Sequence, residues 1–177
     1  MEFFHHGAAL IEHYLEEYGV LALFCTIFLE SLGAPVPGES ALIASSVMAI
    51  EGDMQITHIF FAVWIAAVLG DNTGYLIGRI GGRKLLQRYG WIVKLTPERL
   101  TEFESLFQKW GPLIVAGARF VVILRQLNGI IAGSMAMPWG RFLIANIVGA
   151  ALWTTVWCLG PYFLGDLFNV RALIGKL

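Results

Sequence analysis

The chain has 177 residues, of which 57% are hydrophobic and 14% are charged, and its formal net charge is −1. Soluble domains carry about 25% charged residues, so this composition predicts an integral membrane protein. The small net charge excludes nucleic acid as an expected partner. No basic segment leads into a short apolar run with a small-residue cleavage site, so no cleavable signal peptide is predicted.

The first part of the chain contains an interrupted apolar segment. Residues 8–18 have helical apolar spacing and an acidic face, which predicts a helix lying at the membrane interface. Residues 20–50 are apolar, but prolines, glycines and two carboxylates interrupt them between Glu30 and Glu39. Inside a bilayer such a break is tolerated only where the backbone is buried in protein or lines a polar cavity. We therefore predict a re-entrant helical hairpin, a device with which transporters build sites at the membrane midplane.

A spanning helix and a basic loop follow. Residues 55–78 are long and apolar enough to cross a membrane, and they carry Asp71 near their end. Seven of the twelve basic residues lie between Arg79 and Lys109. Because cytoplasmic loops are rich in lysine and arginine, the loop 79–109 is expected to be cytoplasmic.

The second half of the chain follows a similar plan. An amphipathic helix is predicted to begin at Pro97 and to run to about residue 110. Residues 111–137 are apolar again but carry Arg119 and Arg125, and residues 140–164 form another candidate span. The second apolar segment is therefore predicted to be a second re-entrant hairpin.

Short sequence matches support an internal duplication. They recur in the same order in both halves: Tyr18-Gly19 with Trp110-Gly111, residues 41–46 with 129–134, and residues 75–78 with 162–165. Internal repeats, often inverted across the bilayer, are typical of transporters. The predicted fold is an all-α membrane protein with an inverted repeat. Its single domain covers 1–177, with repeat 1 at about 8–80, a basic loop at about 79–96 and repeat 2 at about 97–165.

The charges are distributed unequally between the two hairpins. The first carries Glu30 and Glu39, and the second carries Arg119 and Arg125. If the hairpins face one another, acids and bases meet in one cavity, where pairing lowers the cost of burying each. The planar fork of arginine suits a phosphate, and a carboxylate in a low dielectric binds a proton readily. The arginines are therefore predicted to bind an anionic head group, and the carboxylates to couple its release to protonation.

Other polar residues are less informative. Asp71 is assigned to proton coupling, with a packing or capping role as an equal alternative. On an unbroken helix, side chains six residues apart point about 120° away from each other, so both arginines reach one phosphate only if the helix unwinds. Cys25 and Cys158 are predicted to be packing residues rather than a disulfide or metal site. No metal and no cofactor are expected.

The chain resembles the DedA family of bacterial membrane proteins, also called the SNARE-associated or VTT-domain family. The resemblance covers roughly residues 18–165 and is carried by these residues: Phe28-Leu29-Glu30, Pro35-Val36-Pro37-Gly38-Glu39, Gly70-Asp71, Gly74-Tyr75, Gly78-Arg79, Gly81-Gly82, Arg119-Phe120, Arg125, Ala132-Gly133, Met135, Phe142, Asn146, Gly149 and Trp153. It implies two re-entrant hairpins, an inverted repeat and lipid translocation in the bacterial inner membrane, by a multi-pass protein. It also implies undecaprenyl phosphate or a phospholipid as cargo, and dependence on the proton-motive force.

One departure from the family pattern bears on the second hairpin. Many members have a proline where this chain has Val122. The hairpin is therefore expected to bend elsewhere, at Asn128-Gly129.

The residues favour transport over catalysis. A membrane lipid phosphatase needs an arginine–serine–histidine set, and no histidine falls in an apolar segment beside a polar cluster, so no enzymatic activity is expected. A phospholipid scramblase and a proton-coupled small-ion antiporter stay open as alternatives. The favoured function is a flippase for an anionic lipid phosphate, driven by protons or by sodium. A homo-oligomer stays open.

Overall fold

A computed structural model describes residues 19–89 and 97–167. The interfacial helix predicted at residues 8–18 lies outside them. The described residues form helices and no strand, which confirms the all-α prediction. In chain order the helices are α2 (Val20–Leu32), α3 (Gly38–Glu51), α4 (Ile56–Tyr89), α5 (Pro97–Ala118), α6 (Val122–Ser134), α7 (Trp139–Thr154), the π-helix η2 (Thr155–Leu159) and α8 (Gly160–Leu167).

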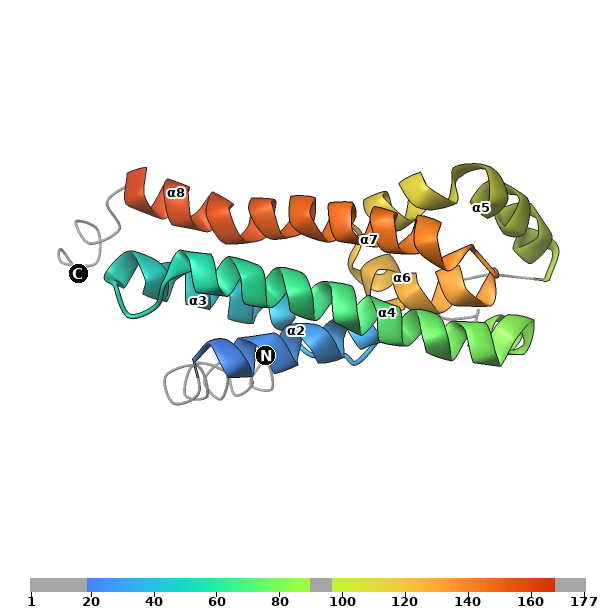
Figure 1. Cartoon of the computed structure of the whole chain (residues 1–177), viewed down its shortest axis with the longest axis horizontal. Helices are drawn as coiled ribbons and strands as arrows, with labels where there is room; N and C mark the ends of the chain where they lie inside the picture. Colours follow the sequence, from blue (N-terminus) through green and yellow to red (C-terminus); the bar gives the residue numbers. More distant parts are fainter. Residues whose placement is uncertain (1–18, 90–96, 168–177) are drawn as a thin grey trace.

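The first apolar segment breaks where the sequence predicts. Helix α2 ends at Leu32, and Gly33 follows with a φ of 113°, a left-handed conformation that favours glycine. The prolines at 35 and 37 prevent the helix from continuing, because they lack a backbone donor and restrict the residue before them. Helix α3 then begins at Gly38 and returns along α2, so the two form a hairpin (Figure 1).

The second hairpin differs from its prediction in two places. Helix α5 was predicted to end near residue 110, but it continues through Pro112 to Ala118. The bend predicted at Asn128-Gly129 is also wrong, since both residues lie inside α6 and the chain breaks at residues 119–121. The break ends at the β-branched residue Val121, which is extended, with φ −115° and ψ 115°. It also leaves Arg119 in the turn rather than on a helix.

Two long antiparallel rods run beside the hairpins. Figure 1 shows α4 running the full length of the molecule, and α7, η2 and α8 returning in one continuous path beside it. Residues Ile56–Gly81 and Trp139–Phe163 are each long and apolar enough to cross a membrane. The spanning helix predicted at 55–78 is therefore part of a longer helix, and Asp71 lies near its middle rather than near its end.

The two hairpins enter the molecule from opposite ends. In Figure 1 the turn between α2 and α3 and the turn between α5 and α6 both lie near the middle of the long rods. The matched segments at 41–46 and 129–134 fall in α3 and α6, the returning arm of each hairpin. This arrangement places the two turns where four helices meet. Re-entrant insertion and the inverted repeat stay predictions.

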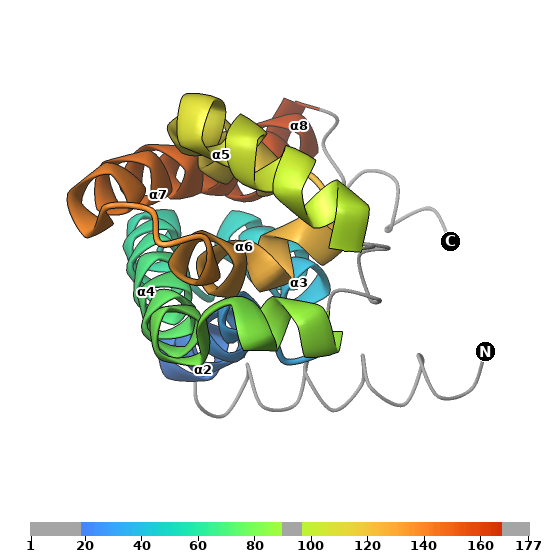
Figure 2. The same cartoon turned by 90° about the vertical axis from the view of Figure 1, so that its right-hand side faces the viewer.

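Helices α4 and α6 pack backbone against backbone. A Cβ atom added to Gly129 would collide with the carbonyl group of Asp71, and one added to Gly133 would collide with that of Tyr75. Figure 2, along the long axis, shows α6 between α4 and α5. The side chain of Tyr75 crosses to the far end of α6, where its hydroxyl donates to the carbonyl of Met137 at 2.5 Å. These contacts fix the register of the middle of α4 against α6.

Candidate functional site: two arginine clusters between the hairpins

Arg125 joins the two hairpins. It lies in the first turn of α6 and donates from Nη2 to Oε1 of Glu30 at 2.6 Å and from Nη1 to Oε1 of Glu39. Glu30 comes from the end of α2 and Glu39 from the start of α3, so one guanidinium spans both arms of the other hairpin. We call Arg125, Glu30, Glu39 and Trp153, described below, the Arg125 cluster. It shows that the predicted acids and bases do meet.

The local structure around Pro37 and Gly38 positions both carboxylates. A Cβ atom added to Gly38 would meet the carboxylate of Glu30 and, at 2.9 Å, the Cδ1 atom of Ile27. Only glycine therefore leaves room for the Glu30 side chain beneath the start of α3. Glu39 lies in the first turn of α3, where the helix dipole favours a negative charge.

The Arg125 cluster has more acid than base and is partly open. Two carboxylates face one guanidinium, so the fully ionised cluster has a formal charge of −1, and one added proton makes it neutral. Side chains of Arg125 and Glu30 are 3% and 5% exposed, whereas that of Glu39 is 30% exposed. Glu39 is therefore the most accessible member of the cluster.

Trp153 of α7 completes this cluster. The guanidinium carbon of Arg125 lies over the Trp153 ring, 4.8 Å from its centre. The ring is 1% exposed, and its Nε1 atom has no hydrogen-bond partner among the described residues. Three directions around the guanidinium are thus occupied by two carboxylates and one aromatic face.

Arg119 forms a separate, sealed cluster. Its Nη2 atom donates to Oδ2 of Asp71 at 2.6 Å, to Oδ1 of Asn146 at 2.5 Å and to the carbonyl of Ala67 at 3.3 Å. Asn128 donates to Oδ2 of Asp71 at 3.4 Å and to the carbonyl of Val115 at 3.1 Å. The side chains of Arg119 and Asp71 are 0% exposed. We call Arg119, Asp71, Asn128 and Asn146 the Arg119 cluster.

The Arg119 cluster keeps unused hydrogen-bonding capacity. Within the described residues, Oδ1 of Asp71 and the Nε and Nη1 atoms of Arg119 are buried without a partner. Buried polar groups of this kind are usually satisfied by ordered water. The formal charge of the ion pair is zero, in contrast to the Arg125 cluster.

All five predicted site residues lie in these clusters, but in two groups rather than one. Arg119 and Arg125 avoid the geometry of an unbroken helix because the chain unwinds at 119–121. Asp71 pairs with Arg119 in the middle of α4, so it does not cap a helix end. Its role in proton coupling and the phosphate-binding roles of the arginines stay predictions.

Three partners were not predicted from the sequence. They are Asn128, Asn146 and Trp153. A usable signal exists in the spacing: Asn146 and Trp153 are two helical turns apart on one face of α7, and Asn128 follows Arg125 by one turn. Spacing along one helix does not show which other segment that face contacts, so it does not connect these residues to the arginines.

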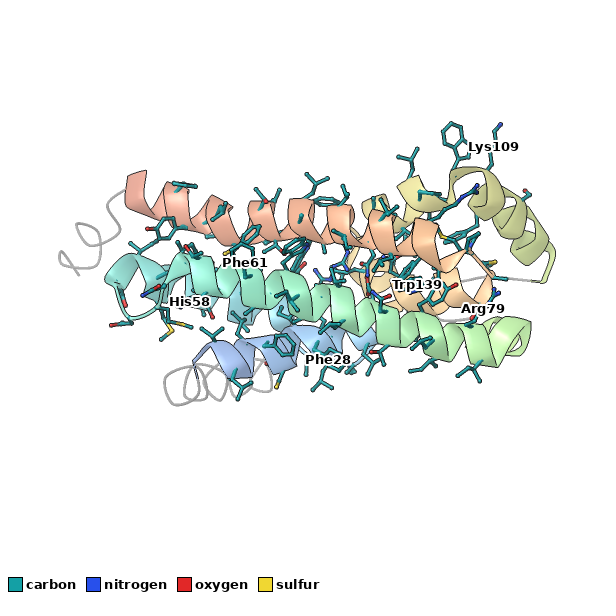
Figure 3. The ribbon with its side chains drawn as sticks, viewed as in Figure 1. Phe28, His58, Phe61, Arg79, Lys109 and Trp139 are labelled. Atoms are coloured by element: carbon teal, nitrogen blue, oxygen red, sulfur yellow. The ribbon has the colours of Figure 1, made fainter. Side chains whose placement is uncertain are left out.

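The polar atoms lie inside and the apolar side chains outside. In Figure 3, nitrogen and oxygen atoms gather between α4 and α7 in the middle of the molecule, while mostly carbon projects from the outer faces, as at Phe28. Arg79 and Lys109 lie at one end and His58 at the other. Cys25 and Cys158 are both free; Cys158 is buried, as expected of a packing residue, whereas Cys25 is exposed. The described residues hold no cluster of three or more metal-ligand side chains.

The sequence matches a known family of membrane proteins. Residues 35–163 match the family model described as VTT domain. An uncharacterized membrane protein from Synechocystis is 35% identical over 93% of this chain and 75% of its own length. One from Mycobacterium tuberculosis is 36% identical over 82% of this chain and 68% of its own length. A Lactococcus lactis protein named alkaline phosphatase-like is 31% identical over 92% and 78%. No solved structure matches the chain.

Proposed function

Because this chain belongs to the VTT-domain (DedA) family of membrane proteins, we propose that it is a transporter that moves an anionic lipid phosphate between the two leaflets. The proposed substrate is undecaprenyl phosphate, and the proposed driving force is the proton gradient. The observation that carries the proposal is the Arg125 cluster, in which one hairpin supplies the cation and the other supplies two carboxylates. A charge at this depth is expensive unless it is paired or used.

Exchange of anionic partners is the proposed mechanism. Arginine binds carboxylates and phosphates through the same in-plane N–H groups. Protonation of Glu39 removes one competing anion from Nη1 of Arg125, and a phosphate oxygen then takes that place. Loss of the proton on the other side restores the Glu39 ion pair and expels the phosphate. The excess carboxylate of the cluster gives the proton a place to bind.

The two arginines contribute differently to this mechanism. Arg125 is paired with the partly exposed Glu39, so it is the first of the two arginines to exchange a carboxylate for the phosphate. Arg119 is sealed by Asp71, Asn146 and a backbone carbonyl, so it contacts phosphate only after that pair has opened. Predicted phosphate binding by Arg119 is therefore a later step in the same cycle, with Asp71 as the carboxylate that it leaves.

The same geometry supports a proposed placement in the membrane. The hairpins α2–α3 and α5–α6 enter from opposite ends, and α4 and α7 span the length between them (Figure 1). We propose that the hairpins are re-entrant, that they form an inverted repeat, and that their turns lie near the midplane. Arg79 and Lys109 then mark the cytoplasmic end of the molecule in the inner membrane.

Proteoliposomes test the proposal directly. The purified chain is reconstituted with undecaprenyl phosphate, and movement of the lipid between leaflets is measured with and without an imposed pH gradient. Faster movement with the gradient supports a proton-coupled flippase. Equal movement without it indicates a scramblase, and no movement of any lipid by folded protein contradicts the proposal.

The same vesicles separate the other classes. A small-ion antiporter dissipates the pH gradient when sodium is added, without lipid movement. Release of inorganic phosphate would indicate a phosphatase, the activity named for the Lactococcus relative. A phospholipid in place of undecaprenyl phosphate distinguishes the two lipid cargoes.

A further inference from the structure

Trp153 contacts the face of the Arg125 guanidinium, a surface that neither carboxylate contacts. The guanidinium carbon lies over the indole ring, 4.8 Å from its centre. Attraction between a cation and an aromatic face strengthens when both are removed from water, and here the ring is 1% exposed and the arginine side chain 3% exposed. The contact is therefore a desolvated one.

The ring and the anions use different parts of the guanidinium. Hydrogen bonds to carboxylate or phosphate run from the edges of the planar group, whereas an aromatic ring contacts its face. Glu30 and Glu39 occupy two edge nitrogens, and Trp153 occupies the face. Trp153 therefore does not compete with any anion, and its attraction does not depend on a proton.

The position of the ring is set by rigid surroundings. Trp153 belongs to an apolar cluster with Leu23 and Ile27 of α2 and Leu42 of α3, so the first hairpin packs against it. It is followed at once by the π-turn Thr155–Leu159, a local irregularity that often occurs at functional sites. Its free Nε1 atom shows that no hydrogen bond to the described residues orients the ring, so packing and the cation hold it.

We propose that Trp153 is a positioning residue that holds the Arg125 guanidinium at the meeting point of the hairpins while its anionic partners exchange. This inference rests on the proposed function, because it names the group that keeps the phosphate ligand in place between carboxylate and phosphate. Without the ring, Arg125 released from the carboxylates is free to leave the site. With the ring in place, the N–H groups at the edges of the guanidinium stay directed toward the incoming phosphate oxygen atoms.

The contact itself is tested by a fluorescence cycle of four proteins: wild type, Arg125→Gln, Trp153→Phe and the double variant. Emission is recorded in detergent, without lipid substrate. If the cation lies on the ring, Arg125→Gln shifts the emission of the wild type, and this shift is lost when residue 153 is phenylalanine. An equal shift in both backgrounds overturns the inference, whatever the transport assay shows.

The positioning role is tested by binding of geranylgeranyl phosphate in detergent. Trp153→Leu removes the aromatic face and is expected to weaken binding about tenfold, while Trp153→Phe keeps a weaker face and loses about threefold. The matched control is Trp157→Leu, which removes an indole packed on the same apolar cluster. The described residues place no cation on that ring.

The outcomes separate this inference from the proposed function. Equal losses in Trp153→Leu and Trp157→Leu would assign the effect to packing and overturn the positioning role. If the wild type neither binds geranylgeranyl phosphate nor moves any lipid, the proposed function fails, and the positioning role fails with it even where the fluorescence cycle shows the contact. Rescue by phenylalanine but not by leucine supports the positioning role.

Discussion

The two arginine clusters contain the same kind of ion pair in opposite settings. Arg119 and Asp71 are fully sealed, balanced in charge and surrounded by side-chain amides. Arg125 faces two carboxylates, of which Glu39 is half-buried, and lies on an aromatic ring. The comparison indicates that the Arg119 pair stabilises the broken helix, whereas the more open, acid-rich Arg125 cluster is the one suited to the proposed exchange of partners.

Removing the sealed cation should have the largest effect on folding. Arg119→Ala leaves Asp71 buried without its counter-charge, which is expected to lower the free energy of unfolding by about 3–5 kcal/mol. Thermal unfolding in detergent measures the change. The matched variant Arg119→Ala with Asp71→Ala should recover part of it, and a single variant as stable as the wild type would contradict the structural role of this pair.

Replacing Arg125, whose anionic partners are proposed to exchange, should affect transport rather than folding. Arg125→Lys keeps the charge but loses the planar fork that bridges Glu30 and Glu39, and lipid transport is expected to fall about a hundredfold, corresponding to about 3 kcal/mol. The vesicle assay measures the rate. Arg141→Lys, at an exposed arginine on α7, is the control and should transport normally. Full activity of Arg125→Lys would show that fork geometry is not needed.

Neutralising Glu39 should uncouple transport from the proton gradient. Glu39→Gln removes the group proposed to exchange the proton, so the acceleration by a pH gradient, expected to be about tenfold in the wild type, should disappear. The measurement compares rates with and without the gradient in each protein. Asp53→Asn, an exposed carboxylate outside both clusters, should keep the acceleration. A Glu39→Gln variant that still responds to the gradient would move the proton site elsewhere.

A single methyl group should produce the smallest effect. Gly38→Ala places a Cβ atom against the carboxylate of Glu30 and Ile27, and the resulting displacement should lower the free energy of unfolding by about 1–3 kcal/mol. The control is Gly140→Ala, at a helical position where a Cβ atom would meet nothing within 4 Å. That variant should be neutral or slightly stabilised. Equal melting temperatures for both variants would remove the steric argument about Glu30.

Most of the helical plan could be predicted from the sequence because strong local signals determine it. The prolines at 35 and 37 break the first segment whatever surrounds them, and apolar length predicts the two spans. The second break lacks a proline, and its position depends on where Arg119 finds Asp71, a contact 48 residues away along the chain. No local pattern contains that information.

The candidate site was predictable in its members but not in its pairing. Intramembrane charge is rare enough that Glu30, Glu39, Asp71, Arg119 and Arg125 could be selected from their types alone. Which acid meets which base depends on how the second hairpin packs against α4 and against the first hairpin, contacts between segments far apart in the chain. Asn146 and Trp153 belong to the family pattern, but an amide and an indole carry no charge, so their types did not connect them to the arginines.

The glycine contacts between α4 and α6 also provide an internal distance standard. Two helices that touch through Gly129 and Gly133 have no intervening side chains to rearrange. Spin labels at the exposed positions Leu76 and Val122 should therefore report one unchanging separation in every condition. The distances from a third label at Val47, on α3, to these two labels can then be measured as lipid and pH are varied. Any change in those distances reports movement of the first hairpin.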